Sequence, residues 1–109
     1  MSFHVVRTAE ARWQGTLPEG SGRIALGSGA FDGPYSLRAR VEEAVPAANP
    51  EELLGAAEAA CFTMSLANLL NEQGHPPEDL QTTANVVLEQ TETGFTITGI
   101  TLEASIAGG

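Results

Sequence analysis

Hydrophobic and polar residues alternate in three short stretches within the first 42 residues of the chain. Over residues 9–17, alanine, tryptophan and leucine share one face and charged or polar residues share the other, a period of two that indicates a half-buried strand. Residues 23–26 and 36–42 alternate in the same way, and turns rich in glycine and proline separate the stretches. The pattern predicts three consecutive antiparallel strands, and it places Arg40 on the face opposite the apolar residues.

A long helix is predicted after these strands. Asn49 suits the N-cap, Pro50 suits the first helical position, and Glu52 completes a capping box. The helical pattern continues to about Gln73, and Gly74 suits the residue that follows a helix end. Apolar side chains point nearly all round this helix, which is typical of a helix that is buried on every side. Three short strands cannot cover it, so either later chain or a second subunit must.

Two longer strands are predicted after the helix. Residues 82–89 alternate with a period of two, and residues 95–106 do so with a shift of phase at Thr98–Gly99, where a β-bulge would fit. The element order β-β-β-α-β-β is typical of the α+β class. The sequence therefore predicts a single domain over residues 1–109, in which an antiparallel sheet packs on a long central helix.

Composition narrows the possible functions. The 109 residues include 14 acidic residues and 5 arginines, for a net charge of -9, which argues against binding to nucleic acid or an anionic membrane. The N-terminus lacks the basic start and apolar run of a signal peptide. The longest uncharged stretch of the apolar region, residues 59–71, has 13 residues, against about 20 needed to cross a membrane. With one cysteine and no internal disulfide, we expect a cytoplasmic domain.

No metal or cofactor is expected. His4 and His75 lie far apart in the sequence and, with Cys61, fit no ligand spacing. The sequence also contains no glycine-rich phosphate-binding motif and no Gly-x-Ser-x-Gly nucleophile motif.

Cys61 is the residue that could carry chemistry, and residue types alone leave two interpretations open. One is a small apolar filler in a buried helix. The other is a reactive thiol, because Cys61 belongs to the polar stripe of the helix and buried polar groups require a cavity or a partner. The positive end of the helix is too distant to stabilise a thiolate, so a reactive Cys61 needs a cation from another element, and the candidates are the N-terminal arginines. The polar stripe comprises Glu58, Cys61, Ser65, Asn68 and Glu72.

Two sequence blocks carry a family resemblance. Residues 34–42 read Pro-Tyr-Ser-Leu-Arg-Ala-Arg-Val-Glu, and residues 49–62 read Asn-Pro-Glu-Glu-Leu-Leu-Gly-Ala-Ala-Glu-Ala-Ala-Cys-Phe. These blocks resemble the OsmC/Ohr family of osmotically inducible and organic-hydroperoxide-resistance proteins, and the first block is closer to the OsmC branch. The resemblance implies a thiol-dependent peroxidase for oxidative-stress defence, which reduces organic hydroperoxides to alcohols and is regenerated by a dithiol reductant.

The resemblance also implies roles for three residues. Cys61 matches the peroxidatic cysteine, Glu51 the glutamate and Arg40 the arginine of the OsmC branch, and Arg23 is the alternative if the preceding hairpin supplies the arginine, as in the Ohr branch. In the implied reaction, Arg40 stabilises the thiolate and the developing alkoxide, and Cys61 becomes a sulfenic acid. Glu51 would hold the arginine fork, although a negative charge at a helix start is favourable in any case.

Helix geometry constrains this arrangement. Glu51 and Cys61 are ten residues apart, which is about 15 Å along one helix axis. One straight helix cannot bring both to a small peroxide unless long side chains bridge the gap, so otherwise either the helix start is bent or two chains contribute. Together with the apolar circumference of the helix, this favours an intertwined homodimer with sites at its interface, and members of the family are dimers of this kind.

The family pattern continues with a further helix, which carries a resolving cysteine, and a final strand, and the 109 residues end before both. Three interpretations stay open: a fragment of a normal enzyme, the product of a truncated gene, or an enzyme that uses one cysteine and an external thiol. The alternative function is a catalytically impaired dimeric binding domain, and a third is a structural dimer with Cys61 as filler.

Overall fold

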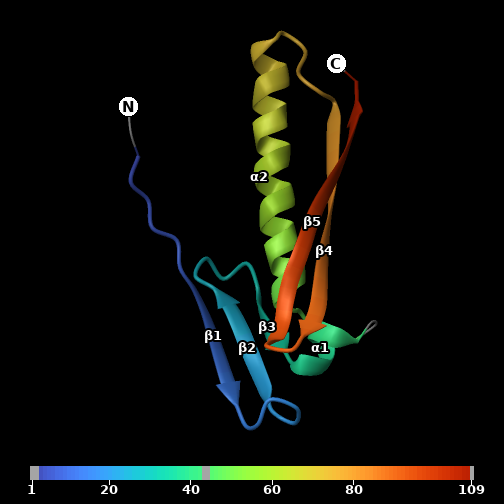
Figure 1. Cartoon of the computed structure of the whole chain (residues 1–109). Helices are drawn as coiled ribbons and strands as arrows, with labels where there is room; N and C mark the ends of the chain where they lie inside the picture. The colour runs from blue at the N-terminus through green and yellow to red at the C-terminus, as the bar shows by residue number, and fades with distance from the viewer. Residues whose placement is uncertain (1–2, 43–44, 109) are drawn as a thin grey trace. The chain divides into compact units, whose positions relative to one another are not determined.

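The computed structural model describes residues 3–42 and 45–108. The chain divides into two compact units, Met1–Asn49 and Pro50–Gly109, and each unit is described by itself. The first unit contains a three-stranded sheet and a short helix, and the second contains a long helix and a two-stranded ribbon (Figure 1). Both sheets are antiparallel, as the α+β prediction required.

The first unit is a β-meander. Strands β1 (Ala9–Gln14), β2 (Ser21–Leu26) and β3 (Asp32–Tyr35) are hydrogen-bonded in the order β1-β2-β3. The predicted first hairpin is confirmed, but β1 is shorter than expected, because the chain turns at Gly15 with a φ of 97°. This left-handed conformation favours glycine, which has no Cβ.

An aromatic pair packs across the middle strand of this sheet. Trp13, Gly22 and Tyr35 lie in one row of the β1-β2-β3 register. The two rings meet edge to face with their centroids 5.5 Å apart. Gly22 makes this contact possible, since a Cβ there would lie 2.5 Å from Tyr35 Cε1 and 2.7 Å from Trp13 Cε3.

The predicted strand over residues 36–42 is wrong. The third strand ends at Tyr35, and helix α1 (Leu37–Val41) follows it. The side chain of Ser36 caps this helix by accepting a hydrogen bond from the Ala39 backbone N–H at 3.2 Å. Leu37 and Val41 alternate like strand residues but are also four apart, so a stretch this short fits either period and the cap decides between them.

The second unit confirms the helix and the two long strands. Helix α2 (Pro50–Glu72) begins at the expected proline, and Gly74 follows its end with a φ of 79°. Strands β4 (Asp79–Thr91) and β5 (Gly94–Ala107) form an antiparallel ribbon beside α2 (Figure 1). The register skips Thr98, because Val87 pairs with Gly99 and Leu88 with Ile97, which confirms the predicted irregularity.

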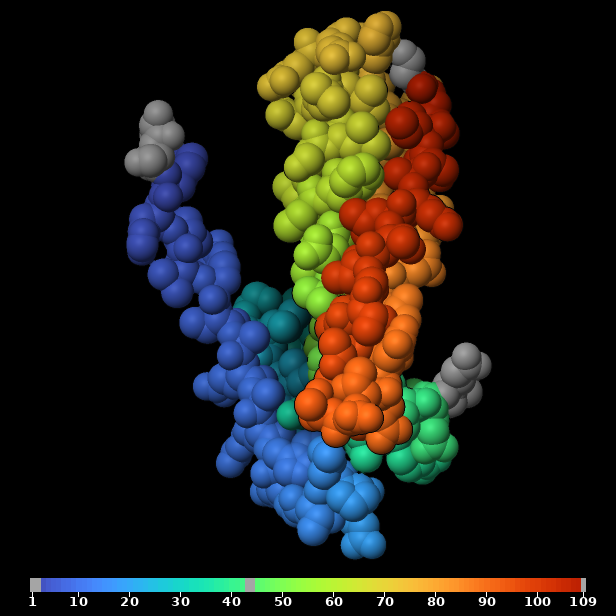
Figure 2. Space-filling view, viewed as in Figure 1, coloured from blue at the N-terminus to red at the C-terminus, as the bar shows by residue number. Residues whose placement is uncertain are grey.

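One face of α2 packs on this ribbon, mainly on β4, and Figure 2 shows the helix and the ribbon lying together in the second unit. A Cβ on Gly55 would lie 3.1 Å from Val86 Cγ2 and 3.4 Å from the Cβ of Ala84, so glycine allows a close approach here. Farther along, the Thr63 hydroxyl lies 2.7 Å from the Ala59 carbonyl oxygen and 2.6 Å from Thr82 Oγ1. These contacts hold the helix against β4.

The remaining faces of α2 expose apolar side chains. Phe62 is 41% exposed, Met64 74% and Leu69 50%, so the later strands cover the apolar helix on one side only. By length and composition α2 could cross a membrane, because Glu58 is the one charged residue among residues 53–70. The core helices of soluble proteins can have the same length and composition, and the absence of membrane binding stays a prediction.

Candidate functional site

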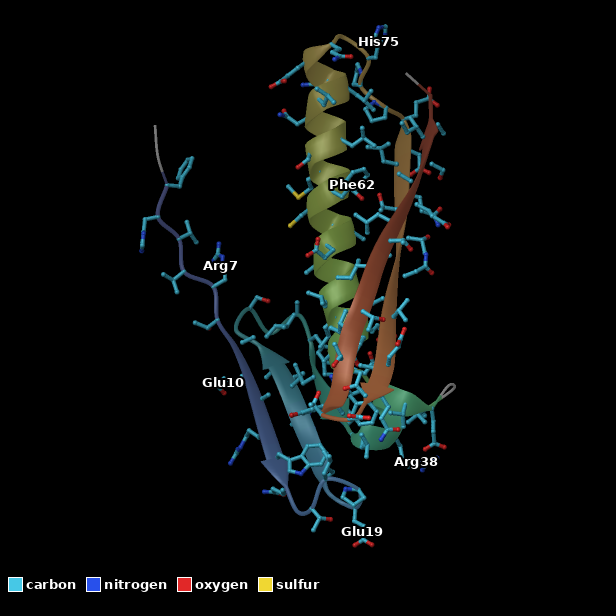
Figure 3. The ribbon with its side chains drawn as sticks, in the orientation of Figure 1. Arg7, Glu10, Glu19, Arg38, Phe62 and His75 are labelled. Atoms are coloured by element: carbon cyan, nitrogen blue, oxygen red, sulfur yellow. The ribbon has the colours of Figure 1, made fainter. Side chains whose placement is uncertain are left out.

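Cys61 lies near the middle of α2 and is exposed. Figure 3 labels Phe62, its neighbour in the sequence, midway along the helix. All five residues of the polar stripe are exposed, and within it Asn68 Nδ2 donates to Glu72 Oε1 at 3.3 Å. The stripe thus lies away from the face that packs on β4, and the thiol is open to a reagent.

The immediate neighbours of Cys61 on the helix surface are Glu58, three residues before it, and Ser65, four residues after it. The start of α2 at Pro50 lies eleven residues away, or about 16 Å along the axis. The partial positive charge of a helix N-terminus fades within one turn. The second unit therefore offers Cys61 a nearby carboxylate and no helix-end charge, so a reactive Cys61 would need a cation from another part of the protein.

Glu51 occupies the first turn of α2 and is only 7% exposed. Burial of a carboxylate is costly unless it is partnered, and Glu51 does have an interaction partner. Helix α2 is uninterrupted from Pro50 to Glu72 and straight in Figure 1, so the suggested bend at its start is absent. Glu51 and Cys61 are therefore about 15 Å apart along the axis and about 80° apart around it, and one copy of α2 does not bring them together.

The two candidate arginines lie in the first unit. Arg40 is half-buried in the last turn of α1 and, like Glu51, is not without a partner. Arg23 lies on β2, where its Nε donates to Asp32 Oδ1 in an exposed ion pair. Arg23 is therefore already matched with a carboxylate, and Arg40 is engaged as well, so pairing within the first unit does not choose between them. The approach of either arginine to Cys61 stays a prediction.

The fold and the Cys61 helix can be compared with known proteins. The sequence profile of the OsmC-like protein family matches residues 42–109. A relative, Peroxiredoxin OsmC of Escherichia coli strain K12, is 40% identical over 108 residues, which cover 98% of this chain and 73% of the relative. The chain belongs to the OsmC-like protein family. Glu51 and Cys61 lie inside the segment that the family profile matches.

Solved OsmC-like structures agree with this assignment. An organic hydroperoxide resistance protein OsmC from Legionella pneumophila is 29% identical and superposes with a TM-score of 0.70, covering 96% of this chain and 74% of the other. The organic hydroperoxide resistance protein OhrB of Bacillus subtilis is 29% identical with a TM-score of 0.67, covering 91% and 71%. The OsmC/Ohr resemblance and the α+β fold class are therefore both confirmed.

Proposed function

We propose that this chain is a cysteine-based peroxidase that reduces organic hydroperoxides, with Cys61 as the attacking thiol. Membership of the OsmC-like family supports a peroxide-related redox function in general, and relatives are named as a peroxiredoxin and as organic hydroperoxide resistance proteins. The observation that carries the finer proposal is the exposed Cys61 on the central helix, inside the matched segment. An exposed thiol can meet a substrate without a structural change.

The proposed reaction is a two-electron reduction of the hydroperoxide by the Cys61 thiolate. The Cys61 thiolate attacks the terminal oxygen of the hydroperoxide, a sulfur–oxygen bond forms, and the oxygen–oxygen bond breaks. The sulfur is oxidised by two electrons and the peroxide is reduced. The leaving alkoxide takes up a proton to become the alcohol, and the cysteine is left as a sulfenic acid.

Arg40 and Glu51 are proposed to assist this step. A guanidinium beside the sulfur favours the thiolate, and it also stabilises the negative charge that develops on the leaving oxygen. Glu51 is proposed to accept hydrogen bonds from Arg40 and hold its planar fork in place. Because α2 separates Glu51 from Cys61 by about 15 Å, we propose that the two residues act in one site through a homodimer, with one chain supplying Cys61.

Regeneration requires two electrons from a thiol. One thiol of an external dithiol attacks the sulfenic acid, releases water and forms a mixed disulfide, and the second thiol then restores Cys61 and leaves the reductant as a disulfide. The proposed partner is a dithiol, as the family resemblance implies, because one dithiol molecule supplies both thiols. A cytoplasmic location suits this reducing chemistry and stays a prediction.

The direct test is turnover of cumene hydroperoxide with dithiothreitol by the parent chain and by Cys61→Ser. Turnover by the parent and none above the uncatalysed rate by Cys61→Ser would support the proposal. Equal turnover by both would overturn it.

Matched variants test the two assisting residues. Arg40→Gln is compared with Arg38→Gln, which removes the same charge from α1 but lies in an exposed pair with Glu42. Glu51→Gln is compared with its neighbour Glu52→Gln. For Arg40→Gln we expect kcat/KM to fall about 100-fold or more, because one donor that stabilises the developing charge is lost. We expect a smaller loss for Glu51→Gln and little change in the two controls.

The alternative is a binding domain that kept the fold without the activity, and it predicts different results for cysteine alkylation and for peroxide turnover. Cys61 would then be alkylated by iodoacetamide at the same rate in the parent and in Arg40→Gln, and no variant would consume peroxide. A chain in which Cys61 is only a filler would lose nothing on Cys61→Ala.

A further inference from the structure

A hollow of about 330 Å³ lies at the three-stranded sheet, within the first unit. It is lined by residues 12–14 of β1, by residues 21–23 of β2 and by Pro34 of β3, and of these Arg12, Gln14, Ser21 and Arg23 share the polar face of the sheet. None of these residues has a role in the proposed peroxidase reaction, apart from Arg23 as the weaker alternative arginine.

The strand register explains why the hollow is basic. Arg12 lies directly opposite Arg23, and Arg23 lies directly opposite Pro34, so the three form one row across the sheet. Side chains directly opposite each other share a face, with their Cβ atoms about 4.5–5.5 Å apart. In the next row Gln14 lies opposite Ser21. The short side chain of Ser21 leaves space between the longer side chains of Gln14 and the two arginines.

Two like charges placed opposite each other destabilise a sheet unless something compensates them. Asp32 compensates the charge of Arg23 through an ion pair between Arg23 Nε and Asp32 Oδ1. Asp32 and Ser21 lie on opposite sides of the Arg12–Arg23 row. Glu10 shares the polar face with Arg12, two residues along β1, and Figure 3 shows Glu10 on that strand. Neither Glu10 nor Arg12 forms an ion pair with any residue in the described part of the chain. Within the described part of the chain, Arg12 thus has no carboxylate at ion-pair distance, and its guanidinium can accept an anionic ligand.

We infer that this hollow binds an oxyanion group, a phosphate or a carboxylate of a small molecule, between Arg12 and Arg23. Both groups match the planar donor fork of arginine, which binds them through two parallel hydrogen bonds. Gln14 offers an amide donor and Ser21 a hydroxyl donor at the same hollow. A bound oxyanion would also relieve the repulsion between the two guanidinium groups. This inference does not rest on the proposed peroxidase function.

Binding is measured by titrating pyrophosphate and, separately, citrate into the full chain and following backbone amide shifts in nitrogen–proton NMR spectra. We expect saturable shifts confined to β1, β2 and β3. Arg12→Gln should raise the Kd at least ten-fold, because hydrogen bonds between charged groups are stronger than those between neutral groups. The matched control Arg38→Gln removes the same charge from the same unit outside the hollow, and it should change the Kd less than two-fold.

Further arms of the experiment separate the explanations. Arg12→Lys keeps the charge and loses the fork, so intermediate binding would support recognition by the fork. Saturation by pyrophosphate alone or by citrate alone identifies the group that the hollow prefers. Shifts that do not saturate, or an equal loss in Arg38→Gln, would overturn the inference. The Cys61→Ser variant should bind like the parent, so failure of the peroxidase proposal leaves this result unaffected.

Discussion

Gly22→Ala tests the packing that organises the first unit. The added Cβ would lie 2.5 Å from Tyr35 Cε1, 2.7 Å from Trp13 Cε3 and 2.6 Å from the backbone oxygen of Arg12. All three distances fall well inside the carbon contact optimum of about 3.5–4.0 Å. The backbone oxygen cannot move without disturbing the β1-β2 ladder, so the rings and the strands must separate.

The expected magnitude follows from three terms. Overpacking costs about 1–3 kcal/mol, and loss of the edge-to-face geometry removes a further 0.5–1.5 kcal/mol or so. Replacing glycine by alanine in a strand returns roughly 0.5–1 kcal/mol. We therefore expect Gly22→Ala to lower the free energy of unfolding by about 0.5–4 kcal/mol.

Urea unfolding followed by tryptophan fluorescence measures this loss, because Trp13 is the one tryptophan in the chain and is itself part of the contact. The matched control is Gly99→Ala on β5, where an added Cβ meets nothing within 4 Å. The control should be neutral or slightly stabilising. An unchanged or higher stability of Gly22→Ala would refute the packing argument.

Three further changes have defined outcomes. Thr63→Val removes the hydroxyl that joins α2 to Thr82, and urea unfolding should show a loss of about 1 kcal/mol. Ser36→Ala removes the α1 cap, and hydrogen exchange of the α1 amides should accelerate by about five-fold, the equivalent of about 1 kcal/mol. Glu58→Gln removes a negative charge three residues from Cys61, and alkylation of the thiol by iodoacetamide should accelerate about two-fold.

Each of these changes has a control that lacks the contact. The exposed Thr101→Val should leave stability within about 0.5 kcal/mol of the parent. Ser28→Ala, in the β2–β3 loop, should leave α1 exchange unchanged. Glu72→Gln removes a charge from the same stripe about 16 Å from Cys61 along the axis, so it should not affect alkylation. Equal effects in a variant and its control would contradict the assigned contact.

The sequence predicted those elements whose signals were local and redundant. Helix α2 has a proline start, a glycine after its end and more than twenty residues of helical pattern, and all of these agree. The two long strands keep a period of two over many residues, so even the irregularity at Thr98 could be predicted from the shift of phase.

The failure at residues 36–42 has a local cause as well. Leu37, Ala39 and Val41 fit a strand by their alternation, whereas the Ser36 cap and the Arg38–Glu42 ion pair stabilise a helix. A five-residue element is too short for its period to decide between the two. For the site, the sequence placed Cys61 and Glu51 correctly on one helix. The partner of Arg40 depends on contacts between elements far apart in the sequence, which no local pattern records.

Trapping of the oxidised cysteine tests the central claim most directly. The parent chain is treated with one equivalent of cumene hydroperoxide in the presence of dimedone, which labels sulfenic acids, and its intact mass is measured. The account predicts one dimedone adduct, mapped to Cys61 by peptide analysis, and one equivalent of alcohol released. An unmodified Cys61 thiol after the peroxide has been consumed would contradict it.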